Sequence, residues 1–150
     1  MSGAEGTTKI IGNNPMGFAA PSAYMAGEAG EGFPLLFDIA MSYASWGKIN
    51  ERIGAGEAIP ALWARDGEGR PTTDPAKARD GGTVTPMAEH KGFGLAVMNE
   101  LLTAGLAGGE MAGELVDSGG VNTHSQTALA IDVGRIIPLE TFLDLSLIHI

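Results

Sequence analysis

Asp38 occupies the position in this sequence that most favours ligand chemistry. It follows the apolar run Leu35–Phe37, which is predicted to form a strand buried on both faces. Apolar residues at helical spacing come next, so a helix is expected from about Ser42. Ligands of α/β proteins bind at the carboxyl ends of strands, beside the N-termini of the following helices. Asp38 would there accept hydrogen bonds from ligand hydroxyls, and exposed amides near Ser42 would meet an anion; alternatively, Asp38 only caps the helix.

A second candidate is the pair His90-Lys91, which precedes Gly92 and Gly94 at the start of another predicted helix. The helix dipole disfavours cations in a first turn unless an anion binds there, so a phosphate would explain the placement. The two glycines would let a ligand approach the backbone closely. The alternative is a solvated first turn that packs closely on a neighbouring segment.

Asn14 is a third candidate, in the turn Gly12-Asn13-Asn14-Pro15. This turn follows a short apolar patch, Lys9–Ile11, which is expected to be a strand. Asparagine tolerates left-handed backbone and offers both amide donors and an acceptor. The turn would hold a ligand carboxylate or a cofactor, or it is a plain Asx turn.

Alternating strands and helices are expected to position these residues, which makes the chain an α/β protein. Glycines in Gly54-Ala55-Gly56 end the first helix, and the expected surface loop Tyr24–Gly32 precedes its strand. The remaining predicted elements are a turn at Asp66–Gly69, a helix starting near Pro75 and broken at Asp80–Gly82, a helix over Lys91–Leu106 with Leu95, Met98, Leu101 and Leu102 on its apolar face, a strand at Thr127–Asp132, and a helix from Leu139–Leu143.

Composition and charge limit the kinds of partner. The chain has 150 residues, 44% of them hydrophobic, and a formal net charge of −9. No cluster of lysines and arginines occurs, which argues against nucleic acid and anionic membrane as partners. There is no cysteine and no histidine spacing typical of a metal pair, so no metal site is predicted. The N-terminus has neither the basic nor the apolar region of a signal peptide.

Several segments, in order, resemble the malate, L-sulfolactate and ureidoglycolate dehydrogenase type of NAD(P)-dependent oxidoreductase, which is distinct from the Rossmann lactate and malate dehydrogenases. Together they cover roughly residues 12–132. The matching pieces are Gly12–Pro15 with Ala19-Ala20-Pro21, Pro34–Ser42, Gly47-Lys48-Ile49, Ile59-Pro60, Trp63–Asp66, Gly69–Pro75, Lys91–Leu95 and Ala130-Ile131-Asp132.

The resemblance implies a mixed sheet flanked by helices, in a non-Rossmann NAD(P)-binding domain that is incomplete here. It implies that Asp38-Ile39-Ala40 and His90-Lys91 contact NAD or NADP. The reaction implied is hydride transfer between nicotinamide and the 2-position of a 2-hydroxy or 2-oxo acid, although some members reduce cyclic imino acids. Members are typically cytoplasmic homodimers or larger assemblies. A non-catalytic nucleotide-binding or interaction module is the alternative.

Departures from the family pattern affect catalysis. The family's acid/base histidine and its carboxylate-binding arginine lie upstream of this segment, so no residue here is predicted to be catalytic. The family usually has threonine at two positions that are occupied here by Asn13 and Met41. Residues 1–144 are therefore expected to be a partial NAD(P)-binding domain of a longer dehydrogenase. Leu145–Ile150 resemble a translated transposon-end sequencing adapter, the alternative being a coincidental apolar helix end.

Overall fold

The computed structural model describes residues 1–3, 6–22, 34–115 and 124–146. The predicted surface loop Tyr24–Gly32 and the last four residues lie outside that description. The elements are β1 (Met16–Ala20), β2 (Leu35–Ile39), α1 (Trp46–Ala55), β3 (Ala64–Arg65), α2 (Pro75–Arg79), β4 (Thr83–Val84), α3 (His90–Glu100), the π-helical turn η1 (Leu101–Gly105), α4 (Ala112–Leu115), the 3-10 turn η2 (Val133–Arg135) and α5 (Leu139–Ser146). The predicted α/β class is confirmed, as small sheets combined with helices.

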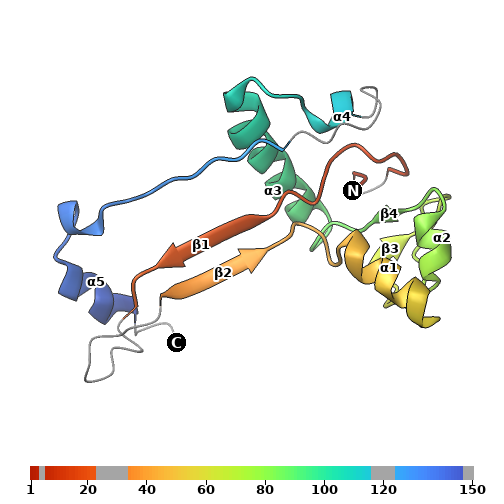
Figure 1. The fold of residues 1–150 in the computed structure, drawn as a ribbon, viewed down its shortest axis with the longest axis horizontal. Coiled ribbons are helices and arrows are strands. Elements are labelled where there is room, and N and C mark those ends of the chain that lie inside the picture. The colour runs from red at the N-terminus through yellow and green to blue at the C-terminus, as the bar shows by residue number, and fades with distance from the viewer. Residues whose placement is uncertain (4–5, 23–33, 116–123, 147–150) are drawn as a thin grey trace. The chain divides into compact units, whose positions relative to one another are not determined.

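The chain divides into two compact units. The first contains Met1–Met16 and Ala40–Thr127, and the second contains Gly17–Ile39 and Ala128–Ile150. In the first unit, β3 pairs with β4 in antiparallel fashion. Helix α2, which lies between them in the sequence, contacts both strands as well as α1 (Figure 1). Among the described residues, no helix is both long enough and apolar enough to cross a membrane.

Local capping explains where the helices of the first unit begin and end. The Ser45 hydroxyl accepts a hydrogen bond from the Lys48 amide, and α1 ends at Gly56 with a left-handed φ of 67°. The Asp74 carboxylate caps α2, and Pro75 occupies its first turn. The predicted glycine stop and the predicted start near Pro75 are confirmed. The predicted start of the first helix at Ser42 is wrong, because Ser42 forms a bridge with Pro86.

A small core lies between α1, α2 and the paired strands β3 and β4. Ile49 of α1, Ala78 of α2 and Ala64 of β3 are fully buried, and Val84 of β4 is almost completely buried. Full burial of a side chain such as Ile49 stabilises the folded state by about 1.5–3 kcal/mol relative to leaving it exposed. This core holds the paired strands in place, and β4 leads to the start of α3.

The second unit contains a two-stranded ribbon of β1 and β2, whose arrows point in opposite directions (Figure 1). The strand predicted at Leu35–Phe37 is confirmed and extends to Ile39. Its predicted burial on both faces is wrong, since Leu36 is 71% exposed and Phe37 is 51% exposed. The reason is that a two-stranded ribbon buries side chains only beneath another layer, and the described residues leave these side chains open to solvent.

Two other predicted strands do not form. At Lys9–Ile11, the amides of Ile10 and Ile11 donate to the Met1 carbonyl instead of to a partner strand. At Thr127–Asp132, the Thr127 hydroxyl donates to the Leu102 carbonyl, and the following residues are exposed without strand pairing. Apolar composition alone therefore misidentified these segments, because a strand also needs a partner for its backbone groups.

Helix α3 buries a different face from the one predicted. The helix is confirmed, but Leu95 and Met98 of the predicted apolar face are 43% and 53% exposed. Small residues and one carboxylate are buried instead, namely Gly92, Ala96, Glu100 and, in η1, Ala104. The small residues allow close backbone approach, which is visible most clearly at Gly92. An added Cβ there would overlap the Met87 carbonyl oxygen and lie 2.8 Å from that of Met41.

Candidate functional site

A strained turn precedes α3. Ala88 and Glu89 have φ angles of 47° and 54°, in the left-handed region that few side-chain-bearing residues adopt. Such strain persists only where the surroundings fix it, and it clusters at functional sites. The turn is held by hydrogen bonds from the Glu89 amide to the Pro86 carbonyl and from the Gly92 amide to the Met87 carbonyl.

The first-turn amides of α3 are already used by the chain itself. Lys91 donates to Ala88, Gly92 to Met87 and Phe93 to Glu89. An anion at this helix start would therefore be met mainly by side chains. The sequence left two roles open for Gly92 and Gly94, namely close approach of a ligand or close packing on a neighbouring segment. Gly92 packs on backbone, whereas Gly94 faces open space. Only Gly94 therefore leaves room for a ligand.

His90 and Lys91 line a hollow of about 420 Å³ in the first unit. Its size falls within the range of roughly 300–1,000 Å³ typical of ligand sites. Both side chains are exposed, and they share the hollow with Arg65 of β3, which the sequence did not single out. The remaining lining residues are Tyr43, Ala61, Leu62, Pro71, Thr85, Ala88 and Glu89. The site thus combines cationic side chains with an apolar wall.

Asp38 and Ile39 are the last two residues of β2, in the second unit. Ala40 is the next residue and the first of the segment Ala40–Thr127, which belongs to the first unit. Asp38 is exposed, and it does not cap α1, whose cap is Ser45. The alternative in which Asp38 only caps the helix is therefore wrong. The contact of this segment with a cofactor stays a prediction.

Asn14 makes contacts within the chain that the sequence did not reveal. Its φ is 32°, and its side-chain Nδ2 donates to the Ala96 carbonyl at 2.8 Å and to the Glu100 carboxylate at 3.0 Å. The Asn99 side chain donates in turn to the Asn14 carbonyl at 3.0 Å. These bonds tie the turn to the buried face of α3, so the amide of Asn14 is already occupied.

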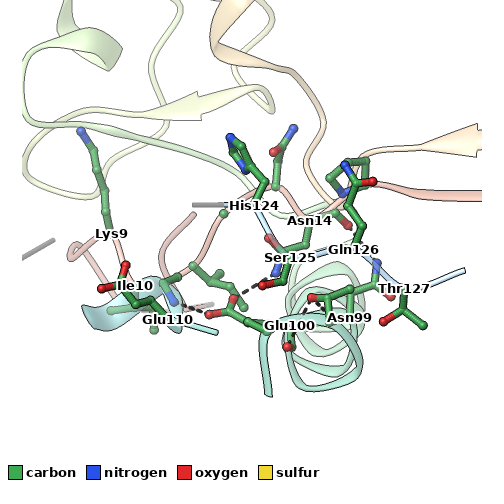
Figure 2. Close-up of a pocket in the computed structure, with 17 residues that line it drawn as sticks. Lys9, Ile10, Asn14, Asn99, Glu100, Glu110, His124, Ser125, Gln126 and Thr127 are labelled. Carbon is green, nitrogen blue, oxygen red and sulfur yellow. Dashed lines mark hydrogen bonds between the residues drawn. The ribbon is translucent and has the colours of Figure 1, made fainter. Parts of the chain in front are cut away.

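Glu100 lines a second hollow, of about 690 Å³, which Figure 2 shows with Asn14, Asn99 and His124 also at its walls. Its carboxylate also accepts a hydrogen bond from the Ala112 amide. The residue is only 8% exposed, and the two donors compensate for the burial of its charge. The sequence carried only a weak signal for this role, because Glu100 falls four residues after Ala96 and therefore on the same face of the helix.

The comparisons with known proteins identify the family. The family model described as malate/L-lactate dehydrogenase matches residues 1–146. The chain is 45% identical over 103 residues to a (2R)-3-sulfolactate dehydrogenase (NADP(+)) of Chromohalobacter salexigens, covering 69% of this chain and 28% of that protein. It is 39% identical over 110 residues to a Δ(1)-pyrroline-2-carboxylate/Δ(1)-piperideine-2-carboxylate reductase of Pseudomonas putida, covering 73% and 30%.

A solved structure supports the same assignment. A putative malate/lactate dehydrogenase from E. coli matches with a TM-score of 0.64 and 33% identity, over 73% of this chain and 29% of that one. The α/β fold and the sequence both match proteins of one family. The chain belongs to the malate/L-lactate dehydrogenase family, as its resemblance predicted. It spans about 30% of the length of the curated relatives it matches.

Proposed function

We propose that the chain is the cofactor-binding part of an NAD(P)-dependent oxidoreductase that acts on a 2-hydroxy or 2-oxo acid. The match of the family model to residues 1–146 carries this proposal. The nicotinamide cofactor, when bound, supplies or accepts the hydride. The chain's own contribution is to bind and orient that cofactor, through Asp38-Ile39-Ala40 and His90-Lys91.

The hollow at the start of α3 fits the anionic part of such a cofactor. Lys91 brings a fixed positive charge, and His90 lies beside it in the first turn of the helix. An ammonium is a strong donor to phosphate oxygens, and its charge is otherwise unfavourable at a helix N-terminus. The structural role of Asn14 makes it a weaker candidate for cofactor contact, although its turn lies next to the second hollow.

Catalysis needs two further groups, a proton donor at the reacting oxygen and a cation for the substrate carboxylate. The family resemblance puts both of them upstream of the matched segment. We therefore propose that the 150-residue chain by itself does not catalyse hydride transfer. The complete protein is proposed to be a cytoplasmic homodimer whose partner is a small acid, and neither nucleic acid nor membrane.

Cyclic imino acid reduction is a second candidate activity. The Pseudomonas putida relative is named as a reductase of Δ(1)-pyrroline-2-carboxylate and Δ(1)-piperideine-2-carboxylate. A cyclic imine of this kind and a 2-oxo acid share one feature, an electrophilic carbon attached to a carboxylate. The same cofactor position would serve both, so the residues outside this chain decide between them.

The test is to recover from the source DNA the full reading frame that contains the chain and to express its product. NADH and NADPH oxidation is then measured with pyruvate, oxaloacetate, sulfopyruvate and Δ(1)-pyrroline-2-carboxylate. We expect consumption of one cofactor with at least one acid, and none above a no-protein control for the 150-residue chain. A reading frame without a Ser-His-Gly-type segment upstream, and no turnover, would instead favour a non-catalytic nucleotide-binding or interaction module.

A further inference from the structure

The hollow at the start of α3, which His90 and Lys91 line and which is called the α3 hollow below, concentrates positive charge in a chain whose net charge is −9. Arg65, His90 and Lys91 line it, and Glu89 is the one carboxylate among its lining residues. In contrast, two carboxylates, Glu100 and Glu110, line the hollow of Figure 2, against one lysine, Lys9. An acidic protein attracts an anionic ligand only where cations gather locally, so the α3 hollow is the better anion site of the two.

Most other arginines already have partners. Arg52 pairs with Glu57, Arg70 with Asp66 and Glu68, and Arg135 with Asp132. Arg79 lies over the Trp46 ring, 5.3 Å from its centroid. Across the described ranges, neither Arg65 nor Lys91 pairs with a carboxylate, and these are the two fixed cations of the hollow.

Arg65 is held in place by the chain. It lies in β3, opposite Thr83 of β4, and its Nη1 donates to the Gly69 carbonyl at 2.9 Å. A guanidinium has five N–H donors in a rigid fork, so this one bond orients the group and leaves other donors for a ligand. The side chain is half-buried, which lowers the entropic cost of fixing it on binding.

The wall of the hollow suits a flat ring next to an anion. Ala61, Leu62 and Pro71 provide apolar surface, and Leu62 is 65% exposed. Tyr43, 39% exposed, adds an aromatic face and a hydroxyl. A nucleotide has a flat ring and a negatively charged phosphate. The apolar, partly aromatic wall suits the ring, and the cations at one side suit the phosphate.

We propose that Arg65 is a second cationic contact, together with Lys91, for a phosphate group of the dinucleotide. This inference rests on the proposed function and adds a residue that the family resemblance did not supply. The shared chemistry is a phosphate oxyanion, from either the diphosphate common to NAD and NADP or the 2′-phosphate of NADP alone. A guanidinium fork is well suited to both.

The experiment uses the complete protein that contains the chain, titrated with NADH and with NADPH by fluorescence. R65Q removes the charge, and we expect its dissociation constant to rise by about ten-fold or more. R70Q is the matched control, because Arg70 lies in the turn that follows β3, and its substitution removes ion pairs at a residue that does not line the hollow. We expect R70Q to bind both cofactors like the wild type.

The two phosphate sources give different patterns. Weaker binding of NADPH alone identifies the 2′-phosphate, whereas an equal loss for both cofactors, with competition by inorganic pyrophosphate, identifies the diphosphate. If R65Q binds both cofactors as tightly as the wild type, Arg65 is not a contact, although the proposed function still stands. If the wild type binds neither cofactor, the proposed function itself fails.

A measurement on the wild type guards against a variant that does not fold. The Nε–H resonance of Arg65, assigned by its loss in R65K, is followed by NMR during titration with the cofactor that binds. We expect the resonance to shift in step with cofactor occupancy. A resonance that stays unchanged at saturation overturns the assignment of Arg65.

Discussion

The Asn14 side chain donates a hydrogen bond of 3.0 Å to the buried carboxylate of Glu100. The two residues are 86 positions apart, so this bond fastens a turn near the N-terminus to helix α3. A second bond from the same amide nitrogen, to the Ala96 carbonyl, strengthens the attachment. The polarity of this turn therefore has a clear structural role, whichever ligand binds nearby.

We predict that N14A loosens α3 in the complete protein. The Glu100 carboxylate would lose a donor in a buried position, and alanine is less tolerant of a φ of 32°. We expect the free energy of local opening to fall by about 1–3 kcal/mol, measured by hydrogen exchange of residues 96–104. N13A is the matched control, because Asn13 contributes its backbone carbonyl to Met41 and should tolerate the change. Equal effects of the two variants would contradict the prediction.

Two glycines of one helix should respond in opposite ways. In G92A, the new Cβ would collide with the Met87 and Met41 carbonyl oxygens, which belong to backbone that is bonded in place. We expect a loss of about 3 kcal/mol of stability, seen as a lower melting temperature. In G94A, the Cβ meets open space, and higher helix propensity should stabilise α3 by roughly 0.5–1 kcal/mol. A mild G92A would show that this close approach does not exist in solution.

Local sequence signals predicted the parts of the fold that local interactions determine. Gly56 ends α1, Pro75 opens α2 and Asp66–Gly69 turns the chain, because each depends on one residue's backbone preference or on one nearby bond. The start of α1 was less accurate, since both Ser42 and Ser45 are suitable caps. Only the bridge of Ser42 to Pro86, a distant residue, excludes the first.

Long-range contacts account for the larger errors. The buried face of α3 is determined by Asn14 and Met41, and its own periodicity favoured the more apolar but exposed face of Leu95. Similarly, Arg65 reaches the α3 hollow only through the pairing of β3 with β4. When pairing between distant segments brings residues together, the residue spacing within either segment does not reveal it. The sequence therefore predicted His90 and Lys91 of the candidate site, but not Arg65.

The turn at Asp66 should respond to acid. Its carboxylate accepts hydrogen bonds from the backbone amides of Arg70 and Glu68, and the first of these is the main cause of its lowered pKa. The folded state therefore binds a proton less readily than the unfolded chain. The carboxylate's contribution is complete above its ordinary pKa of about 3.9 and is lost as the pH falls through the lower folded value.

NMR can follow this titration. The amide proton shifts of Glu68 and Arg70 should change together, with a midpoint below the ordinary pKa of an aspartate. In D66N both shifts should become independent of pH over that range. A midpoint at or above the ordinary pKa would contradict the hydrogen-bonded turn.

The terminal segment Leu145–Ile150 should be dispensable. Leu145 is 50% exposed at the end of α5, and the Ser146 hydroxyl donates to the Leu143 carbonyl at 2.6 Å. The apolar residues that follow lie outside the described residues. We expect deletion of 145–150 to leave the soluble fraction after ultracentrifugation unchanged or higher, because removing apolar residues from a chain end lowers the tendency to aggregate. Source DNA that encodes these six residues in a continuing frame would contradict an adapter origin.

The last prediction concerns the two sequence-derived cofactor contacts, in the complete protein. D38A removes an exposed carboxylate from β2, and K91A removes the ammonium from the first turn of α3. Each should weaken NADH or NADPH binding by roughly ten- to hundred-fold, the value of one charge-assisted hydrogen bond of about 1.5–3 kcal/mol. M41A is the packing control, because Met41 is fully buried and should affect melting temperature more than affinity. Fluorescence titration with both cofactors measures the result. If D38A and K91A both bind like the wild type, the cofactor does not contact β2 and α3 through these side chains.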